Sequence, residues 1–175
     1  MITTAAVATV QGAVVFTDLV GFTEFTAVRG DVEAFELLSR QESLVRAALP
    51  PDARLVKELG DGLLLWFPDA RSAVCTTVEL QLAFEAEAAV TELPLWVRIG
   101  LHWGTQAVRG DDVIGHDVNV AARIMAVAGP GEVLLSEETR VAAGPGVAGV
   151  QFDELGPVVM RGIPAPVRLW RAAPG

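Results

Sequence analysis

VVFTDLVGFT, at residues 14–23, joins a run of β-branched and aromatic side chains to a carboxylate, Asp18, and then to Gly21. Val14, Val15 and Phe16 favour a strand that is buried on both of its faces. A neutral residue would end such a strand equally well, so the acid at this position calls for a chemical reason. That reason depends on which other residues the fold brings beside Asp18.

Apolar spacing and turn residues predict alternating elements after this strand. In chain order they are a helix that begins with Asp31 as its cap and ends before Pro50-Pro51, a hairpin over residues 54–67 that turns at Gly60-Asp61-Gly62, a helix from Arg71 to about Val90, and a strand over residues 95–104. Strand, helix, hairpin, helix, strand is the βαββαβ order of a ferredoxin-like sheet, so the predicted fold class is α+β. That fold supports many activities, and function must therefore be argued from a site.

The two long helices are expected to pack on this sheet through apolar stripes at helical spacing. The stripe of the first comprises Phe35, Leu38, Val45 and Leu49, and that of the second comprises Val74, Val78 and Leu82. Later elements are predicted to be a helix from about Asp117 to Ala128, a short helix capped by Ser136, and strands near Val150–Phe152 and Val167–Trp170. No linker interrupts this pattern, so we expect one domain over residues 1–175 with its core at about 13–171.

The composition is that of a compact, acidic protein. Hydrophobic residues make up 51% of the 175 residues, and 22 acidic against 13 basic residues give a formal net charge of −9. An acidic surface repels phosphate backbones, so nucleic acid is not an expected partner. The first 17 residues lack the basic segment of a signal peptide, and no other stretch approaches the roughly 20 apolar residues of a membrane span. We therefore expect a cytoplasmic protein without a membrane partner.

Cysteine and histidine offer little chemistry. The single cysteine, Cys75, excludes an internal disulfide, and two histidines are too few for a typical zinc cage. His102 alternates with apolar residues in a predicted strand, which favours a structural role. His116 is expected to lie exposed near the residues discussed next.

Two acidic residues stand where predicted strands end. Asp18 follows the first strand, and Asp61 lies in the turn of the hairpin. Because the first strand lies beside the hairpin strands in a ferredoxin-like sheet, the two carboxylates can converge. Paired carboxylates without a basic neighbour suit Mg²⁺ or Mn²⁺, and the helix start after Asp18 can hold a phosphate, a combination typical of phosphoryl or nucleotidyl transfer. The alternative is that Asp61-Gly62 only forms a turn and Asp18 only caps a helix.

DDVIGHDVNVAAR, at residues 111–123, adds a second set of polar residues. Asn119 and Arg123 are four apart on a predicted helix, so their side chains share one face. Arginine suits a phosphate, and asparagine can bind a sugar or ring oxygen. Such a pair is common on surfaces, and Lys57, four residues before Asp61, could equally be a solvated lysine.

FTDLVGFT, KELGDG and DDVIGHDVNVAAR, in this order and spacing, resemble the catalytic domain of class III nucleotidyl cyclases over about residues 13–171. The resemblance implies that Asp18 and Asp61, with the backbone of Leu19, bind two ions of Mg²⁺ or Mn²⁺. It assigns base recognition to Lys57 and Asp112.

The resemblance also assigns the residues that handle the ribose and the phosphates. Asn119 and Arg123 become catalytic residues that orient the ribose and stabilise the pentavalent phosphorus. Arg161, in VMRGIP, stands where the family often has a triphosphate-binding lysine. The remaining implied substrate contacts come from Gly21, Phe22 and Thr23.

The choice of base follows from donors and acceptors. A lysine only donates hydrogen bonds, and an ionised aspartate only accepts them. Adenine offers an acceptor at N1 and a donor at its 6-amino group, which match Lys57 and Asp112, whereas guanine reverses both. A wrong base would leave buried polar groups unmatched, so the sequence predicts ATP as the substrate and 3′,5′-cyclic AMP and pyrophosphate as the products.

The leading interpretation is a homodimeric adenylate cyclase whose two sites are shared between protomers. The alternatives are a catalytically silent cyclase-like module, a guanylate cyclase, and another two-metal transferase such as a diguanylate cyclase. The glycine-glycine-acid-acid-phenylalanine signature of diguanylate cyclases is absent from the sequence. Many relatives carry a longer dimer-clasping arm than the segment between Trp103 and Gly115, which predicts a weak dimer.

Overall fold

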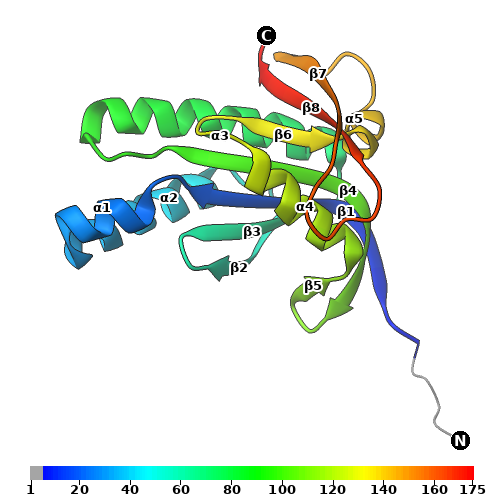
Figure 1. Cartoon of the computed structure of the whole chain (residues 1–175), viewed down its shortest axis with the longest axis horizontal. Coiled ribbons are helices and arrows are strands. Elements are labelled where there is room, and N and C mark those ends of the chain that lie inside the picture. Colours follow the sequence, from blue (N-terminus) through cyan, green and yellow to red (C-terminus); the bar gives the residue numbers. More distant parts are fainter. Residues whose placement is uncertain (1–5) are drawn as a thin grey trace, which may run out of the picture.

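The computed structural model describes residues 6–175, which form one eight-stranded sheet and five helices (Figure 1). The strands are β1 (Thr9–Leu19), β2 (Arg54–Leu59), β3 (Gly62–Phe67), β4 (Val97–Arg109), β5 (Asp112–Ile114), β6 (Val133–Ser136), β7 (Val150–Val158) and β8 (Val167–Pro174). The helices are α1 (Phe22–Arg29), α2 (Asp31–Ala48), α3 (Ala70–Thr91), α4 (His116–Val127) and α5 (Glu137–Ala143). Residues 1–5, part of the stretch considered above for a signal peptide, lie outside the described residues.

The first half of the chain forms the predicted ferredoxin-like core. Its four strands lie in the order β2-β3-β1-β4, and each neighbouring pair is antiparallel. α1 and α2 connect β1 to β2, and α3 connects β3 to β4, as the βαββαβ order requires. Beyond β4, the strands β6, β8 and β7 extend the sheet. The predicted α+β fold with C-terminal additions is therefore confirmed.

β1 lies inside the sheet and is buried on both faces, as its sequence predicts. Val15 belongs to the apolar cluster beneath α2 and α3, together with Leu37 and Val78. Val14 points to the other face and packs with Val118 of α4. α4 therefore covers the face opposite α2 and α3, and it lies in front of the sheet in Figure 1.

The buried faces of the long helices differ from the predicted stripes at two positions. Phe35 is 72% exposed and Leu82 is 48% exposed, whereas Val74 and Val78 are buried as predicted. The residues that α2 buries are Ala34, Leu37, Gln41 and Val45. Phe35 directly follows Ala34, and successive helical residues are turned by roughly 100°, so Phe35 points away from the sheet. The predictions at Phe35 and Leu82 are wrong.

A short helix, α1, precedes α2 and was not predicted as a separate element. Gly30 follows α1 and precedes α2, and its φ of 87° turns the chain between the two helices. Asp31 is the first residue of α2, so its predicted role as the cap is wrong. Within residues 6–175, no side chain caps the start of α2.

The short strands β5 and β6 were also missed. β6 has four residues, all buried, and Ser136 is the last of them. Ser136 also caps α5, as predicted, because its hydroxyl oxygen accepts a hydrogen bond from the Thr139 amide at 3.3 Å. Strands this short give too few alternations to identify from sequence. Among the helices of residues 6–175, none has the length and apolar character needed to cross a membrane.

Candidate active site

Asp18 and Asp61 lie side by side at one end of β1. Asp18 pairs in register with Gly62, and its carboxyl group can share a hydrogen bond with that of Asp61, in the turn between β2 and β3, when one of the two is protonated. Gly62 permits this approach, because a Cβ there would lie 2.4 Å from the Thr17 carbonyl oxygen. Gly60, with a φ of 63°, makes the turn. Gly60 and Gly62 are sufficient to form the turn and to let the strands approach closely. The turn therefore does not require a carboxylate at position 61.

The two carboxyl groups perturb each other. The pKa of Asp61 is raised from its ordinary value of 3.8 to about 6. Burial is the largest cause, and the hydrogen bond with Asp18 and the negative charge of Asp18 raise the pKa further. The folded chain therefore holds a proton on Asp61 more tightly than the unfolded chain does.

The unfolding free energy of the metal-free protein should fall as the pH rises from about 4 to about 6. In this window Asp61 is still protonated in the folded chain while the same group is ionised in the unfolded chain, so each rise in pH removes stability. Urea unfolding in the presence of EDTA at several pH values measures this slope. Asp61→Asn should lack this component, and Asp52→Asn, which removes an exposed carboxylate, should keep it. An unchanged pH profile in Asp61→Asn would contradict the prediction.

Arg98 of β4 lies opposite Asp18 and binds its carboxylate. Its Nε and Nη2 donate to Oδ2 of Asp18 at 3.1 and 2.7 Å, and its Nη1 donates to the carbonyl oxygen of Ala126 in α4 at 3.2 Å. The expectation of a carboxylate pair without a basic neighbour is therefore wrong. The available signal was an arginine between two buried apolar residues, Val97 and Ile99, but its partner follows only from the register of β1 with β4.

Lys57 and Asp112 form an ion pair between β2 and β5. Lys57 Nζ lies 2.8 Å from Oδ2 of Asp112, and Oδ1 of Asp112 accepts from the Val113 amide at 2.8 Å. The hydrogen bond from Lys57 is the main reason that the pKa of Asp112 is lowered. Arg54 also contacts the turn between β4 and β5, where it donates a hydrogen bond to the Asp111 carbonyl oxygen at 2.6 Å. Lys57 thus has a specific partner, and both side chains of the pair remain partly exposed to a ligand.

Asn119 and Arg123 lie together on the exposed face of α4, as their spacing predicts. They line a hollow of about 270 Å³ with Arg161, Gly162 and Ala122. The structure therefore brings Arg161, which is 38 residues further along the chain than Arg123, to the same place. This hollow is open and presents two guanidinium groups, which suits an anion.

The residues after Asp18 form the predicted helix start. α1 begins at Phe22, and its first internal hydrogen bond runs from the Phe25 amide to the Gly21 carbonyl oxygen at 2.9 Å. The amides of Phe22 and Thr23 precede this bond, and within residues 6–175 no side chain caps them. Leu19 buries its side chain, so only its backbone can take part in a site.

The structure thus gathers the candidate residues into three groups within one chain. The first is Asp18 with Asp61 and Arg98, the second is Lys57 with Asp112, and the third is Asn119 with Arg123 and Arg161. The lining of the hollow on α4 does not include Asp18 or Asp61. In a single chain, the residues that line this hollow are therefore distinct from the paired aspartates.

Comparison with known proteins identifies the family of this chain. Residues 6–171 match the family described as the adenylate and guanylate cyclase catalytic domain. The chain belongs to this family. It is 35% identical over 167 residues to the pH-sensitive adenylate cyclase MT1302 of Mycobacterium tuberculosis, a match that covers 94% of this chain and 41% of the relative. It is 36% identical over 129 residues to an adenylate cyclase of Streptomyces coelicolor, covering 70% of this chain and 32% of the relative.

Solved structures show the same fold for this family member. The adenylyl cyclase CyaB from P. aeruginosa superimposes with a TM-score of 0.84 at 22% identity, covering 98% of this chain and 97% of the other. The guanylyl cyclase Cya2 gives a TM-score of 0.77 at 25% identity, covering 98% and 96%. The cyclase chain spans about two fifths of the length of the first curated relative that it matches. Since both an adenylyl and a guanylyl cyclase share the fold, the base must be argued from side chains.

Proposed function

We propose that this domain is an adenylate cyclase that converts ATP to 3′,5′-cyclic AMP and pyrophosphate. The observation that carries the choice of ATP is the Lys57–Asp112 ion pair, which is already assembled at 2.8 Å. Lys57 can donate to N1 of adenine, and Asp112 can accept from its 6-amino group. Guanine would face a donor with a donor and an acceptor with an acceptor. The adenylate cyclase names of the two bacterial relatives support the same choice.

Asp18 and Asp61 fit a divalent cation. Their oxygens are the hard ligands that Mg²⁺ and Mn²⁺ prefer. The pKa of Asp61 is raised chiefly by burial and then by Asp18, and the positive charge of Arg98 only partly offsets this rise. Within residues 6–175, no cluster of three or more histidine, cysteine, aspartate or glutamate side chains is placed to hold a metal. A site with two carboxylates leaves positions for substrate phosphates, as is usual for Mg²⁺. We propose that these two residues, with the backbone of Leu19, hold two ions.

The chain's own residues then divide the work of the reaction. Bound divalent ions would supply Lewis acidity to the ribose 3′-hydroxyl and to the departing pyrophosphate. Asn119 orients the ribose so that its 3′-oxygen attacks the α-phosphorus in line with the leaving group. Arg123 meets the negative charge that grows on the phosphoryl oxygens in the transition state, which is where binding energy increases the rate. Arg161 and the amides at Phe22 and Thr23 hold phosphate oxygens.

The direct test is incubation of the purified protein with ATP or GTP and Mn²⁺, followed by identification of the products by mass. Formation of cyclic AMP from ATP would support the proposal. Formation of more cyclic GMP from GTP than cyclic AMP from ATP would favour a guanylate cyclase. Nucleotide binding without turnover, under conditions where the protein is folded, would favour the silent module.

Replacing Lys57 should change base preference. Lys57→Glu should lower kcat/KM for ATP by at least about tenfold, because a carboxylate cannot donate to N1 of adenine and also repels Asp112. Lys57→Met, which adds no repulsion, should lose the same preference for ATP over GTP. The neighbouring exposed substitution Glu58→Gln serves as the control and should keep that preference. An unchanged ratio of ATP to GTP use in both Lys57 variants would contradict the assignment.

A further inference from the structure

The edge of β4 that faces away from β1 has a short stretch with which no strand pairs, between the segments that pair with β6 and β5. β6 pairs with residues 99–101 of β4, and β5 pairs with residues 107–109. Between them, helix side chains take the place of a strand. The Trp103 amide donates to Oγ1 of Thr139 in α5 at 2.9 Å, and the Thr105 amide donates to Oδ2 of Asp117 in α4 at 2.8 Å.

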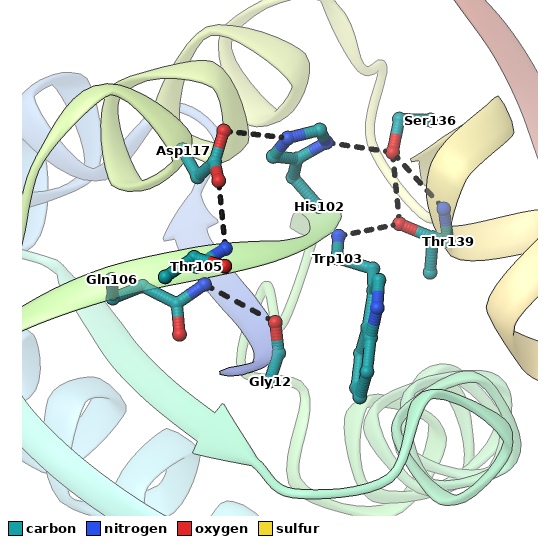
Figure 2. A network of polar contacts seen from close by, with 8 residues as sticks. All are labelled: Gly12, His102, Trp103, Thr105, Gln106, Asp117, Ser136 and Thr139. Atoms are coloured by element: carbon teal, nitrogen blue, oxygen red, sulfur yellow. Dashed lines mark hydrogen bonds and ion pairs between the residues drawn. The ribbon is translucent and has the colours of Figure 1, made fainter. Parts of the chain in front are cut away.

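Asp117 is held from a second side by a buried histidine. Its Oδ1 lies 3.2 Å from Nε2 of His102, and Nδ1 of His102 lies 2.7 Å from Oγ of Ser136 (Figure 2). His102 is only 6% exposed. Both oxygens of Asp117 are therefore engaged by β4, one through a backbone amide and one through a side chain.

Two glycines of β4 allow α4 to approach this closely. A Cβ at Gly104 would lie 2.1 Å from Oδ2 of Asp117, and a Cβ at Gly100 would lie 2.2 Å from the backbone nitrogen of Met125. Gly104 thus makes room for the Asp117 side chain near the start of α4, and Gly100 makes room for the backbone of α4 near the end of the helix. α4 thus lies directly on β4 at both of its ends.

The start of α4 is held by the apolar packing of Val118 and by the contacts of Asp117. Gly115 precedes the helix, and within residues 6–175 no side chain caps it. Asp117 is the second residue of α4, and Asn119 lies only two residues further along. The contacts of Asp117 with β4 add polar contacts to this packing and help to fix the rotation of the first turn, from which Asn119 and then Arg123 project on the exposed side.

We propose that Asp117 and His102 are positioning residues for the cyclase reaction, which set the orientation of α4 and so of Asn119 and Arg123. This inference rests on the proposed function of those two residues. It also gives His102 a role beyond packing, since the imidazole links α4 to Ser136 at the start of α5. The residues proposed for base recognition, Lys57 and Asp112, form their ion pair between β2 and β5, so we expect them to keep their places when Asp117 is changed.

The test is steady-state kinetics of Asp117→Ala at a temperature where the variant is fully folded. Loss of the anchor should lower kcat by at least about tenfold, because a small displacement of a catalytic group is costly, while KM for ATP changes by less than about threefold. Asp117→Asn should restore kcat to within about threefold of the wild-type value. Its amide oxygen can accept from Thr105, and its amide nitrogen can donate to the other tautomer of His102.

The matched control is Gln81→Met, which removes a hydrogen bond of 2.8 Å to the Val97 carbonyl oxygen of β4 from α3, a helix that carries no site residue. It should lower the melting temperature and leave kcat unchanged. Wild-type kcat in folded Asp117→Ala would overturn the inference, as would an equal loss of kcat in Gln81→Met. Asp117→Asn as slow as Asp117→Ala would also overturn it, because negative charge rather than position would then be required.

Failure of the underlying assignment gives a different result. Asn119→Ala and Arg123→Ala are expected to be nearly inactive, and normal activity in these variants would overturn their catalytic roles. Inactive Asn119 and Arg123 variants together with a fully active Asp117→Ala would overturn only the positioning role.

Discussion

Asp61→Asn should lower the rate of cyclic AMP formation by at least about a thousandfold at millimolar Mg²⁺, and Asp18→Asn should do the same. Both substitutions keep the size of the side chain and remove the charge that a divalent cation needs. Asp61→Asn is the cleaner of the two, because Asp18 also binds Arg98 and its replacement releases that guanidinium. The rate is measured with purified protein at saturating ATP.

The fold should survive both changes. The two carboxylates lie at one end of β1 and in a turn, outside the apolar clusters. Removing one of two mutually repelling carboxylates also relieves the cause of the raised pKa of Asp61. Circular dichroism and thermal unfolding serve as controls, with Asp52→Asn as the active comparison. A Mn²⁺-dependent rise in melting temperature should occur in the wild type and be lost in both variants, whereas a near-normal rate in either variant would contradict the metal assignment.

The order of the core elements could be predicted because each has a strong local signal. The residues around Val14 and Val15 are apolar at every position, which is typical of a strand covered on both faces, and the hairpin contains glycines at its turn. The exposed Phe35 was misplaced because helical spacing allows more than one stripe through α2. The sheet itself selects the stripe, and that choice requires tertiary packing.

The candidate site was predictable where two residues share one element or follow a known motif. Asn119 and Arg123 are four apart on one helix, so their common face follows from helical geometry. Arg98 could not be paired with Asp18 in advance, because the two residues are 80 apart in the sequence and the register of β1 with β4 determines their contact. The same holds for His102 and Asp117, whose contact depends on how closely α4 approaches β4.

We expect the three groups of residues to meet around one nucleotide only where two chains associate. In one chain the hollow beside Arg123 and Arg161 is lined without Asp18 and Asp61. We propose that a nucleotide touching all of these groups binds between two chains, one supplying the aspartates and the other supplying Lys57 and α4, as the resemblance to class III cyclases implies. A two-fold dimer repeats this arrangement and contains two equivalent shared sites.

Asp18→Ala and Arg123→Ala should each be inactive alone and should regain activity when mixed. With random pairing, about half of the dimers are hybrids, and each hybrid has one intact site and one site with both defects. Activity should recover to about a quarter of the wild-type value if the sites act independently. Because β4 and β5 form only a short arm, we expect a weak dimer, so recovery should rise with protein concentration. As a control, two differently tagged batches of Asp18→Ala should form dimers without regaining activity. Hybrid dimers of Asp18→Ala with Arg123→Ala that are captured through their tags and remain inactive would show that each site is built within one chain.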